Sequence, residues 1–418
     1  MTSTESSPRR EADEFDTDLD PRSAEFAKDP LRTLSELQSK CPVAKSSHWG
    51  GFWLLTGYDV VFEALHTPEV FSSRPNEHGV RGVPPQPGAG SLAPIDFDQP
   101  ELGFYRSFLL SALSPGSVRE MQPTIRKMAN DFIDQFIERG TADVSDELFT
   151  PLPAQLILRI LGLDASRWAE WVSWVHGFVH EVRVDPEGAE AKVMTMFAEI
   201  YQEISSARAQ PKPGLLGELA VAERDGRALT DDELANMVFL LILGGMDTTA
   251  GLCGNSLLLI DAQPELRKQI LADPSVLDQG TEEFLRYATP TLSLPRTVTK
   301  DTEFHGRQLK KGEQVLIMYA AANRDPSQFD DPETIDLSRK ATRHMAFGLG
   351  VHRCLGSNLA RVMFKIMITE LLTRAPDLAV RRSEVVRYAD ASPVYAVRHL
   401  PITFTPGQRK SSENSLAG

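Results

Sequence analysis

Cysteine is scarce in this chain of 418 residues, which contains only Cys41, Cys253 and Cys354. An odd number of cysteines at scattered positions does not form the disulfide framework of a small secreted domain, and it is typical of a reducing compartment. Long hydrophobic runs are missing too, because the longest, at 237–246, is about half of the roughly 20 residues that span a bilayer. We therefore expect a cytoplasmic protein without a membrane segment.

Positive charge is also in short supply. The chain has 44 Lys and Arg residues against 58 Asp and Glu, and its formal net charge is −14. A surface this acidic repels the phosphate backbone of nucleic acids and the headgroups of anionic membranes, so neither is an expected partner. Hydrophobic residues make up 41% of the chain, which is enough for a large core. We expect a globular monomer.

Most of the chain has the apolar spacing of α-helices, and short strands are expected near its two ends. Helical patterns occupy 117–139, 146–162, 166–183, 189–208 and 231–262, and strand patterns occupy 298–319 and 385–405. These patterns predict a mainly α protein with small β-sheets (α+β). One domain is expected over 25–405, between disordered polar tails at 1–24 and 406–418. The Gly/Pro-rich stretch 75–96 is a candidate lid.

Cys354 lies in the stretch HMAFGLGVHRCLG and has unusual surroundings. Gly348, Gly350 and Gly356 allow the backbone to approach a flat ligand closely. A helix is expected to start after Cys354, and its positive dipole end would face the sulfur. Such surroundings favour a thiolate. The other two cysteines have no polar groups gathered around them in sequence and are expected to be small buried hydrophobes.

Two kinds of metal site could use this cysteine. Zinc takes about four ligands, and the stretch supplies Cys354, His344 and His352 with no second cluster at ligand spacing. Heme iron needs one axial thiolate, together with cationic groups for the propionates of the ring. The sequence favours heme over zinc.

The stretch FGLGVHRCLG resembles the heme-binding loop of the cytochrome P450 family. The matching positions are Phe347, Gly348, Gly350, His352, Cys354 and Gly356. The resemblance extends over roughly 25–405, and it implies the cytochrome P450 fold with Cys354 as the axial ligand of heme b. In that fold the heme lies between a long central helix and the helix that follows the cysteine loop.

The long helix expected at 231–262 contains the stretch LGGMDTT. Gly244 and Gly245 inside a helix cost roughly 1 kcal/mol each relative to alanine, so another factor must favour them. They either allow close packing of a second helix or leave room for O₂ and substrate beside heme. The stretch resembles the family's oxygen-activation site, in which Asp247 and Thr248 are the acid and the alcohol of a proton relay.

Three further sets of residues match family positions. Glu283 and Arg286, three residues apart on one helix face, resemble the E-x-x-R pair, with Arg339 as a third partner in a structural cluster. The positions that match heme-propionate contacts are Arg106, Arg296 and His352. Leu102 stands where the family commonly has a histidine, so one propionate donor is missing. The positions that resemble the wall of a substrate pocket are Leu240, Leu243, Leu292 and Val394.

The resemblance implies a monooxygenase that inserts one oxygen atom from O₂ into a hydrophobic small organic molecule. The sequence has no flavin or nicotinamide fingerprint, so the electrons are expected from a ferredoxin and a ferredoxin reductase. A basic patch formed by Arg353, Arg361 and Lys365 would attract an acidic ferredoxin. The alternatives are a peroxide-driven heme-thiolate oxidase and a heme-binding sensor without oxygenase activity. The pair Asp247 and Thr248 favours activation of O₂.

Overall fold

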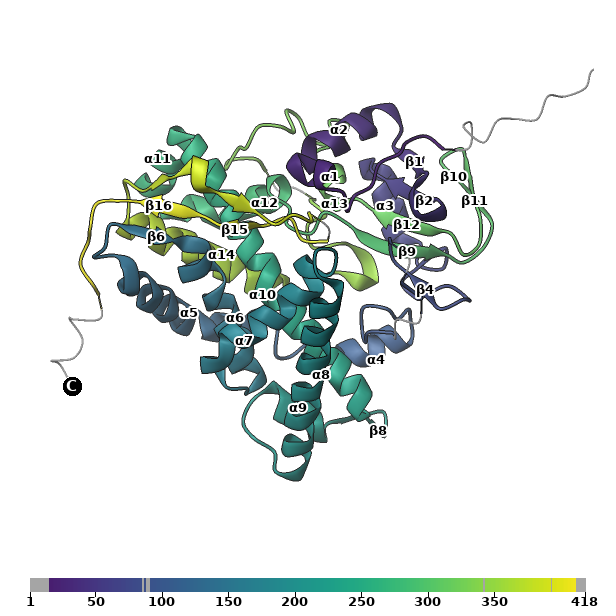
Figure 1. Ribbon diagram of the computed structural model, residues 1–418, viewed down its shortest axis with the longest axis horizontal. Helices are drawn as coiled ribbons and strands as arrows, with labels where there is room; N and C mark the ends of the chain where they lie inside the picture. Colours follow the sequence, from purple (N-terminus) through teal and green to yellow (C-terminus); the bar gives the residue numbers. More distant parts are fainter. Residues whose placement is uncertain (1–14, 85, 88–90, 341–342, 392, 411–418) are drawn as a thin grey trace, which may run out of the picture.

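The computed structural model of this chain describes residues 15–84, 86–87, 91–340, 343–391 and 393–410. Parts of three predicted features fall outside these residues: the N-terminal tail at 1–14, the lid at 85 and 88–90, and the C-terminal tail at 411–418. Helices make up most of the described structure, and the strands form small sheets (Figure 1). The predicted class, mainly α with small β-sheets, is confirmed.

The helical patterns of the sequence correspond to helices in the structure. The longest helix starts at a capping box, in which Thr230 and Glu233 each accept a hydrogen bond from the other's backbone N–H. The described α-helices are α1 (Ala24–Lys28), α2 (Pro30–Lys40), α3 (Tyr58–His66), α4 (Glu101–Ser107), α5 (Pro115–Phe136), α6 (Pro151–Leu161), α7 (Trp168–His176), α8 (Pro186–Ala209), α9 (Leu215–Val221), α10 (Asp231–Ala262), α11 (Pro264–Ala272), α12 (Leu277–Tyr287), α13 (Tyr319–Ala322) and α14 (Ser357–Arg374). A π-helical turn, η5 (Gly177–Glu181), continues α7.

The largest sheet has the strand order β1-β2-β12-β9-β3 and packs beside α2 and α3 (Figure 1). Its strands are β1 (Val43–Ser46), β2 (Phe52–Leu55), β3 (Phe71–Ser72), β9 (Leu294–Val298) and β12 (Gln314–Ile317). Only β12 and β2 run parallel; the other neighbours are antiparallel. The hairpin of β10 (Thr302–Phe304) and β11 (Arg307–Leu309) connects β9 to β12, as the pattern at 298–319 predicted.

The remaining strands are short. They are β4 (Val80–Arg81), β5 (Gln86–Pro87), β6 (Thr141–Asp143), β7 (Glu223–Arg224), β8 (Arg227–Ala228), β13 (Ala379–Val380), β14 (Val386–Arg387), β15 (Val397–His399) and β16 (Pro401–Thr403). β13, β16 and β6 form one sheet, so the C-terminal strands predicted at 385–405 pair partly with a strand from the middle of the chain. β4 and β5 form a hairpin inside the predicted lid.

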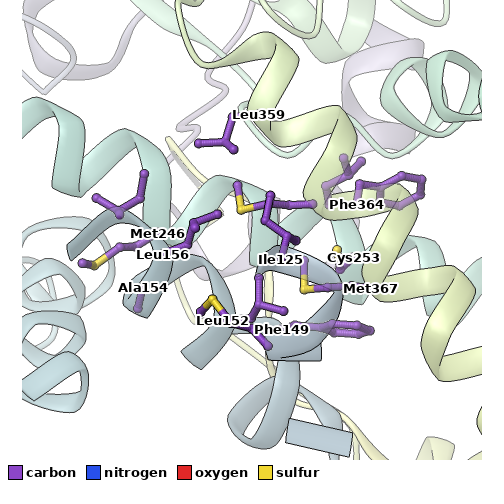
Figure 2. Packing of buried hydrophobic residues seen from close by; sticks show 14 of the residues in the cluster. Ile125, Phe149, Leu152, Ala154, Leu156, Met246, Cys253, Leu359, Phe364 and Met367 are labelled. Carbon is purple, nitrogen blue, oxygen red and sulfur yellow. The ribbon is translucent and has the colours of Figure 1, made fainter. Parts of the chain in front are cut away.

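α10 passes through the main hydrophobic core. Figure 2 shows Cys253 of α10 near Ile125 of α5 and Met367 of α14, and Met246 of α10 near Leu156 of α6. Among the described helices, α10 alone has the length and apolar composition of a membrane span, but 61% of its most apolar stretch is buried inside the protein. Its apolar character therefore serves the packing of the core.

The first part of the described chain corrects the predicted N-terminal boundary. Residues 15–24 were expected in a disordered tail, but they contact the folded domain. The backbone N–H of Asp16 donates to the carbonyl of Lys45 (2.9 Å), and the Arg22 guanidinium pairs with the buried Asp390 (2.6 Å). A polar segment without periodicity is thus held by hydrogen bonds to elements distant in sequence.

The C-terminal boundary is corrected in the same way. Residues 406–410 were expected in the second tail, yet the Arg374 guanidinium donates to the carbonyl of Gln408 (2.7 Å). The backbone N–H of Lys410 donates to the carboxylate of Asp134 (3.0 Å). The contacts with α5 and α14 extend the ordered chain to residue 410.

Candidate active site

The loop before α14 is folded tightly, and two glycines make its path possible. Gly348 and Gly350 have φ angles of +63° and +65°, values that residues other than glycine rarely adopt. A Cβ at Gly350 would also lie 2.6 Å from the carbonyl oxygen of Leu65. The backbone N–H of Cys354 donates to the carbonyl of Phe347 (2.9 Å) and closes the loop. This closed loop fixes the position of the Cys354 side chain.

The Cys354 side chain faces a cavity of about 350 Å³. Cys354 lies deep in the protein. Its accessible surface faces the cavity and forms a part of the cavity wall. Burial raises the pKa of the Cys354 thiol, and this outweighs the opposing effects of the Gly356 N–H and the Arg106 guanidinium. The start of α14 therefore does not by itself maintain a thiolate, and a bound metal cation would supply the missing stabilisation.

α10 forms another wall of this cavity, and its two adjacent glycines have different roles. A Cβ at Gly244 would meet no atom within 4 Å, whereas a Cβ at Gly245 would lie 2.5 Å from Cδ1 of Ile157 in α6. Both glycines touch the cavity. Each of the two explanations drawn from the sequence therefore applies to one glycine: Gly245 allows close helix packing, and Gly244 leaves open space.

Thr248 also lines the cavity, one turn after Gly244. Its hydroxyl donates a hydrogen bond to the Gly244 carbonyl (2.8 Å). Since the hydroxyl hydrogen is engaged, the lone pairs of the Thr248 oxygen are the part available to a molecule in the cavity. In this arrangement Thr248 acts as an acceptor.

Asp247 lies on a different face of α10, because successive residues of a helix point about 100° apart. It does not line the cavity among the described residues, and it is 5% exposed. His180 of η5 donates from Nε2 to the carboxylate (2.8 Å), and Nε2 of His176 in α7 lies 3.7 Å from it. Burial opposes ionisation, yet the two histidines hold the pKa of Asp247 well below its usual range. The predicted acid and alcohol are neighbours in sequence whose side chains diverge.

The two histidines and Tyr388 are site residues that the sequence analysis missed. The Tyr388 ring stacks on His180 with a centroid separation of 3.4 Å, and its hydroxyl lies 3.2 Å from Nε2 of His176. Burial and the nearby Asp247 carboxylate raise the pKa of Tyr388. The spacing of four residues between His176 and His180 was a signal available in the sequence.

Cationic and polar groups line the same cavity as Cys354. They are Arg106 of α4, Arg296 of β9 and His352. Arg106 donates to the Arg353 carbonyl (2.8 Å) and Arg296 to the Pro295 carbonyl (2.7 Å), and no described carboxylate pairs with either guanidinium. Burial lowers the pKa of both Arg106 and His352, whose ring lies 3.0 Å from the Ser73 hydroxyl.

These features fit a heme. No Asp or Glu belongs to the described lining of the cavity, so Arg106 and the buried Arg296 lack a counter-ion that a pair of propionates would supply. The lining is otherwise mostly apolar, with one sulfur, from Cys354, and the open face of Gly244. The residues present therefore match an apolar ring that carries a metal and two carboxylates.

Comparisons with known proteins agree with this geometry. The Cytochrome P450 family model matches residues 270–375. A steroid C26-monooxygenase of Mycolicibacterium smegmatis is 32% identical over 363 residues, which cover 85% of this chain and 88% of that protein. The chain belongs to the cytochrome P450 family.

Other P450s are similar to this chain over most of its length. A linalool 8-monooxygenase of Pseudomonas putida is 32% identical over 78% of this chain and 84% of its own length. The crystal structure of CYP109E1 from Bacillus megaterium in complex with testosterone has a TM-score of 0.83 and 28% identity, and the match covers 92% of this chain and 100% of that one. This P450 is a heme-thiolate monooxygenase, with O₂ and a small molecule as its substrates.

Heme b with a cysteine ligand is the cofactor of this P450. Cys354 is the cysteine that lines the cavity; Cys253 is fully buried in the core, as predicted, and Cys41 is partly buried, where its sulfur accepts a hydrogen bond from Arg307 (3.0 Å). Leu102, one turn before Arg106, is buried and lines the cavity without a polar atom.

Two residues predicted to contact the heme or the substrate do not line the cavity in the described structure. Gly350 does not touch the cavity in the described structure, because its close neighbour is the Leu65 carbonyl; Phe347, Gly348 and Gly356 do touch it. Leu292 is fully buried in the hydrophobic cluster that includes Phe26 and Leu316, away from the cavity. The other predicted pocket residues, Leu240, Leu243 and Val394, line the cavity, and so do Thr291 and Leu294 on either side of Leu292.

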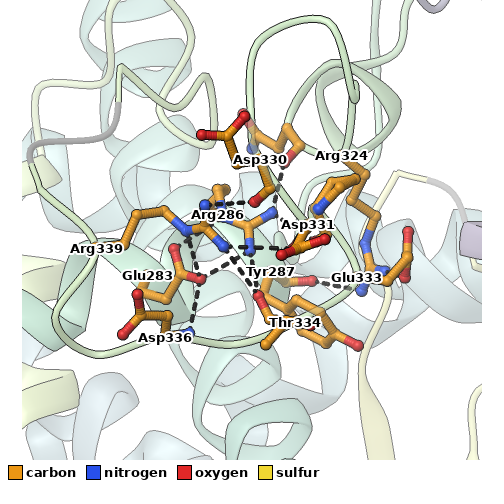
Figure 3. Close-up of polar contacts among 12 residues, drawn as sticks. Glu283, Arg286, Tyr287, Arg324, Asp330, Asp331, Glu333, Thr334, Asp336 and Arg339 are labelled. Atoms are coloured by element: carbon orange, nitrogen blue, oxygen red, sulfur yellow. Dashed lines mark hydrogen bonds and ion pairs between the residues drawn. The ribbon is translucent and has the colours of Figure 1, made fainter.

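The predicted structural cluster is formed (Figure 3). Arg286 donates to both carboxylate oxygens of Glu283 (2.8 Å each), and Arg339 donates to one of them (3.1 Å). Arg286 also donates to three carbonyls of the segment that follows α13, those of Asn323, Pro332 and Thr334. Burial opposes ionisation of Glu283, but the hydrogen bonds lower its pKa. Every polar group of the pair is thus satisfied.

The predicted basic patch of the P450 is largely neutralised. Arg361 donates two hydrogen bonds to Glu282 (2.6 and 2.7 Å), and Lys365 pairs with Asp278. Both cations are therefore bound to α12, while Arg353 beside the cysteine is exposed.

Proposed function

We propose that this P450 inserts one atom of O₂ into a hydrophobic molecule bound against α10, and that Cys354 would hold the iron of its heme. The observation that carries the proposal is the cavity itself. The Cys354 sulfur lines it together with Gly244 and Thr248 of α10, and the rest of its wall is mostly apolar. Bound heme supplies the binding of O₂ and the cleavage of its O–O bond.

The residues around the cavity then have separate tasks. Arg106 and Arg296 would hold the propionates of the heme through charge-assisted hydrogen bonds, and His352 would contribute a third polar contact. The closed cysteine loop keeps the sulfur in place. The apolar wall formed by Leu240, Leu243 and Val394 excludes water and orients the substrate.

Proton delivery is assigned to Thr248 and Asp247. The Thr248 oxygen accepts a hydrogen bond and so holds a water molecule in the cavity. Asp247 is a carboxylate anchored to two histidines, so it transfers a proton only after it exchanges one of these contacts for water on the side of Thr248. His176 lines a second cavity, separate from the heme cavity, from which water can supply protons to the Asp247 side.

The substrate that we propose has an isoprenoid type of skeleton. Similar proteins are named for a steroid, for linalool and for vitamin D₃, and one structural neighbour holds testosterone. The apolar lining of the cavity, which includes Leu240, Leu243 and Val394, supports a hydrocarbon skeleton over a charged one.

We propose a ferredoxin and its ferredoxin reductase as the electron donors. The sequence lacks a flavin or nicotinamide fingerprint, so a separate donor is needed. The exposed Arg353 lies beside the ligand and is the cation best placed to meet an acidic partner, since Arg361 and Lys365 are paired within the chain. The scarcity of cysteine supports a cytoplasmic location, where such donors operate.

The test is a spectral screen followed by turnover. Linalool, testosterone, a fatty acid and a macrolide are titrated into the oxidised protein, and a shift of the Soret band reports displacement of distal water. We expect the isoprenoids to shift the band, and turnover with O₂, ferredoxin, its reductase and NAD(P)H to give a hydroxylated product. Turnover with hydrogen peroxide alone would instead support a peroxide-driven oxidase, and product from neither system would support a sensor.

A further inference from the structure

A second group of metal-ligating side chains lies outside the heme cavity. It consists of His176 at the end of α7, His180 in η5 and Asp247 of α10. One ligand atom from each, an imidazole nitrogen or a carboxylate oxygen, lies within 4.8 Å of the others. The Nε2 atoms of His180 and His176 lie 2.8 Å and 3.7 Å from the Asp247 carboxylate. These distances bracket the separation of about 3.3 Å expected between ligands of a tetrahedral zinc ion.

The local structure explains why these groups converge. Two residues four apart on a helix present their side chains on one face, and α7 with η5 directs that face toward α10. His180 stacks on Tyr388 with an angle of 4° between the rings, which fixes the orientation of its imidazole. His180 and Asp247 are almost fully buried, and Nδ1 of His180 has no hydrogen-bond partner in the described structure. All polar contacts of that ring are therefore made at Nε2.

The group borders, through His176, a cavity that is separate from the heme cavity. A separate cavity of about 360 Å³ is lined by His176 and Tyr388, together with the charged side chains of Asp146, Glu181 and Arg398. None of its described lining residues belongs to the heme cavity. A hydrated cation could enter here, and a water molecule from this cavity could complete its coordination.

The donor set selects the kind of metal. Calcium and magnesium prefer sites made of oxygen atoms, whereas two imidazole nitrogens with one carboxylate suit zinc and similar late first-row divalent ions. We propose that His176, His180 and Asp247 form a zinc site, with water in the fourth position. The ion replaces the hydrogen bond between His180 and Asp247 and neutralises a buried carboxylate.

Zinc at this site would hold Asp247 to α7 and η5. If Asp247 delivers protons as proposed above, the bound ion removes it from that task, and zinc slows O₂-dependent turnover without releasing heme. This consequence rests on the proposed function, whereas zinc binding does not. The two are therefore measured separately.

Binding is measured on chelator-treated holoprotein by competition for Zn²⁺ with a chromophoric chelator. We expect one ion per chain in the wild type. His176→Gln, His180→Ala and Asp247→Asn each remove one of three protein ligands and should weaken binding by about 100-fold or more. Zn²⁺ should raise the melting temperature of the wild type and of none of these variants.

His399→Ala is the matched control. His399 belongs to the second potential metal cluster of the described chain, with Asp143 and Asp146, which is more exposed. This variant should bind Zn²⁺ as the wild type does, within about twofold. Binding lost in His399→Ala, binding retained in the three ligand variants, or no stoichiometric binding would each overturn the site. The isosteric Asp247→Asn and the partly exposed His176→Gln guard against misfolding, which the heme spectrum reports.

Discussion

Two buried carboxylates of this P450, Glu283 and Asp247, are both ionised and both paired, but their partners differ in kind. Glu283 is paired with two arginines, whose charge is permanent. Asp247 is paired with two histidines, whose imidazole nitrogens can also bind a metal ion. The arginine cluster also has a full set of carbonyl acceptors, whereas one histidine keeps a nitrogen without a partner.

This difference separates a fixed structural element from one that can change state. A carboxylate between arginines cannot lose its partners without stranding charges in the core. A carboxylate between histidines can exchange its partners, because a metal ion bound by the imidazole nitrogens can take their place. We therefore expect mutations in the Glu283 cluster to affect stability and mutations around Asp247 to affect proton transfer and metal binding.

The largest effect is expected for Arg286→Leu. This change leaves the Glu283 carboxylate buried without its main partner, so the free energy of unfolding should fall by about 3 to 5 kcal/mol. Urea unfolding of the holoprotein measures it. The matched control is Arg32→Ala, which removes a solvent-exposed pair with Glu36 and should leave the free energy of unfolding nearly unchanged. An equally small loss in Arg286→Leu would show that the cluster is not structural.

Glu282, beside Glu283, combines both kinds of partner and should make stability depend on acid. Burial opposes its ionisation, but hydrogen bonds from Arg361 and His344 lower its pKa to about 2. A carboxyl whose pKa is lower in the folded than in the unfolded protein stabilises the fold at any pH above the unfolded-state pKa. This contribution disappears as the pH falls toward the folded-state pKa. Glu282→Gln should therefore lose about 1 to 2 kcal/mol at neutral pH, after allowance for solvent screening.

The corresponding measurement is urea unfolding of both proteins between about pH 5 and pH 3. The wild type should lose stability faster than Glu282→Gln on acidification, so the two values converge. Parallel curves would mean that the pKa of Glu282 is not depressed in the folded protein.

Thr248→Ala should act on the Asp247 side of the comparison. The hydroxyl contributes little to the core, so unfolding and substrate binding should stay nearly unchanged. Product formed per NAD(P)H consumed should fall several-fold, since the water-holding acceptor is gone. Thr248→Ser keeps the hydroxyl and should retain most of the yield. An unchanged yield in Thr248→Ala would mean that the Thr248 hydroxyl only forms a hydrogen bond with the preceding helical turn and has no part in proton delivery.

A small change in stability is expected for Asp247→Asn as well. The amide of asparagine has the same shape and keeps an oxygen that accepts the hydrogen bond from His180, so the free energy of unfolding should fall by about 1 kcal/mol or less. Oxygen consumption with substrate should slow all the same. Glu283→Gln is the matched amide substitution and should cost several times more stability. A similar loss in the two variants would erase the distinction between the clusters.

Local sequence patterns predicted the elements that rest on local physics. The capping box placed the start of α10, and the cysteine loop and the Glu283 pair follow from short spacings along the chain. The sequence could not show that Asp247 and Thr248 diverge, because adjacency in sequence says nothing about which partners each helix face meets. The partners of Asp247 come from α7 and η5, and Tyr388 of the C-terminal segment stacks on one of them.

The same reason accounts for the other corrections. Leu292 lies between two residues that face the cavity. Its own side chain is buried in another hydrophobic cluster, and this depends on the elements that pack around the segment. Arg361 and Lys365 have the spacing of an exposed basic face, but the acidic residues of α12 lie opposite them. The polar segments at 15–24 and 406–410 are ordered by hydrogen bonds to distant elements. Each correction involves a contact between residues far apart in the chain.

The central claim is that Cys354 holds the heme iron through its thiolate, and one measurement tests it directly. The absorption spectrum of the reduced protein with carbon monoxide should show the strongly red-shifted Soret band of a thiolate-ligated heme. Cys354→His should retain heme and lose that band, while Cys253→Ala, which changes a cysteine buried in the core, should keep it. A red-shifted band that persists in Cys354→His would contradict the account.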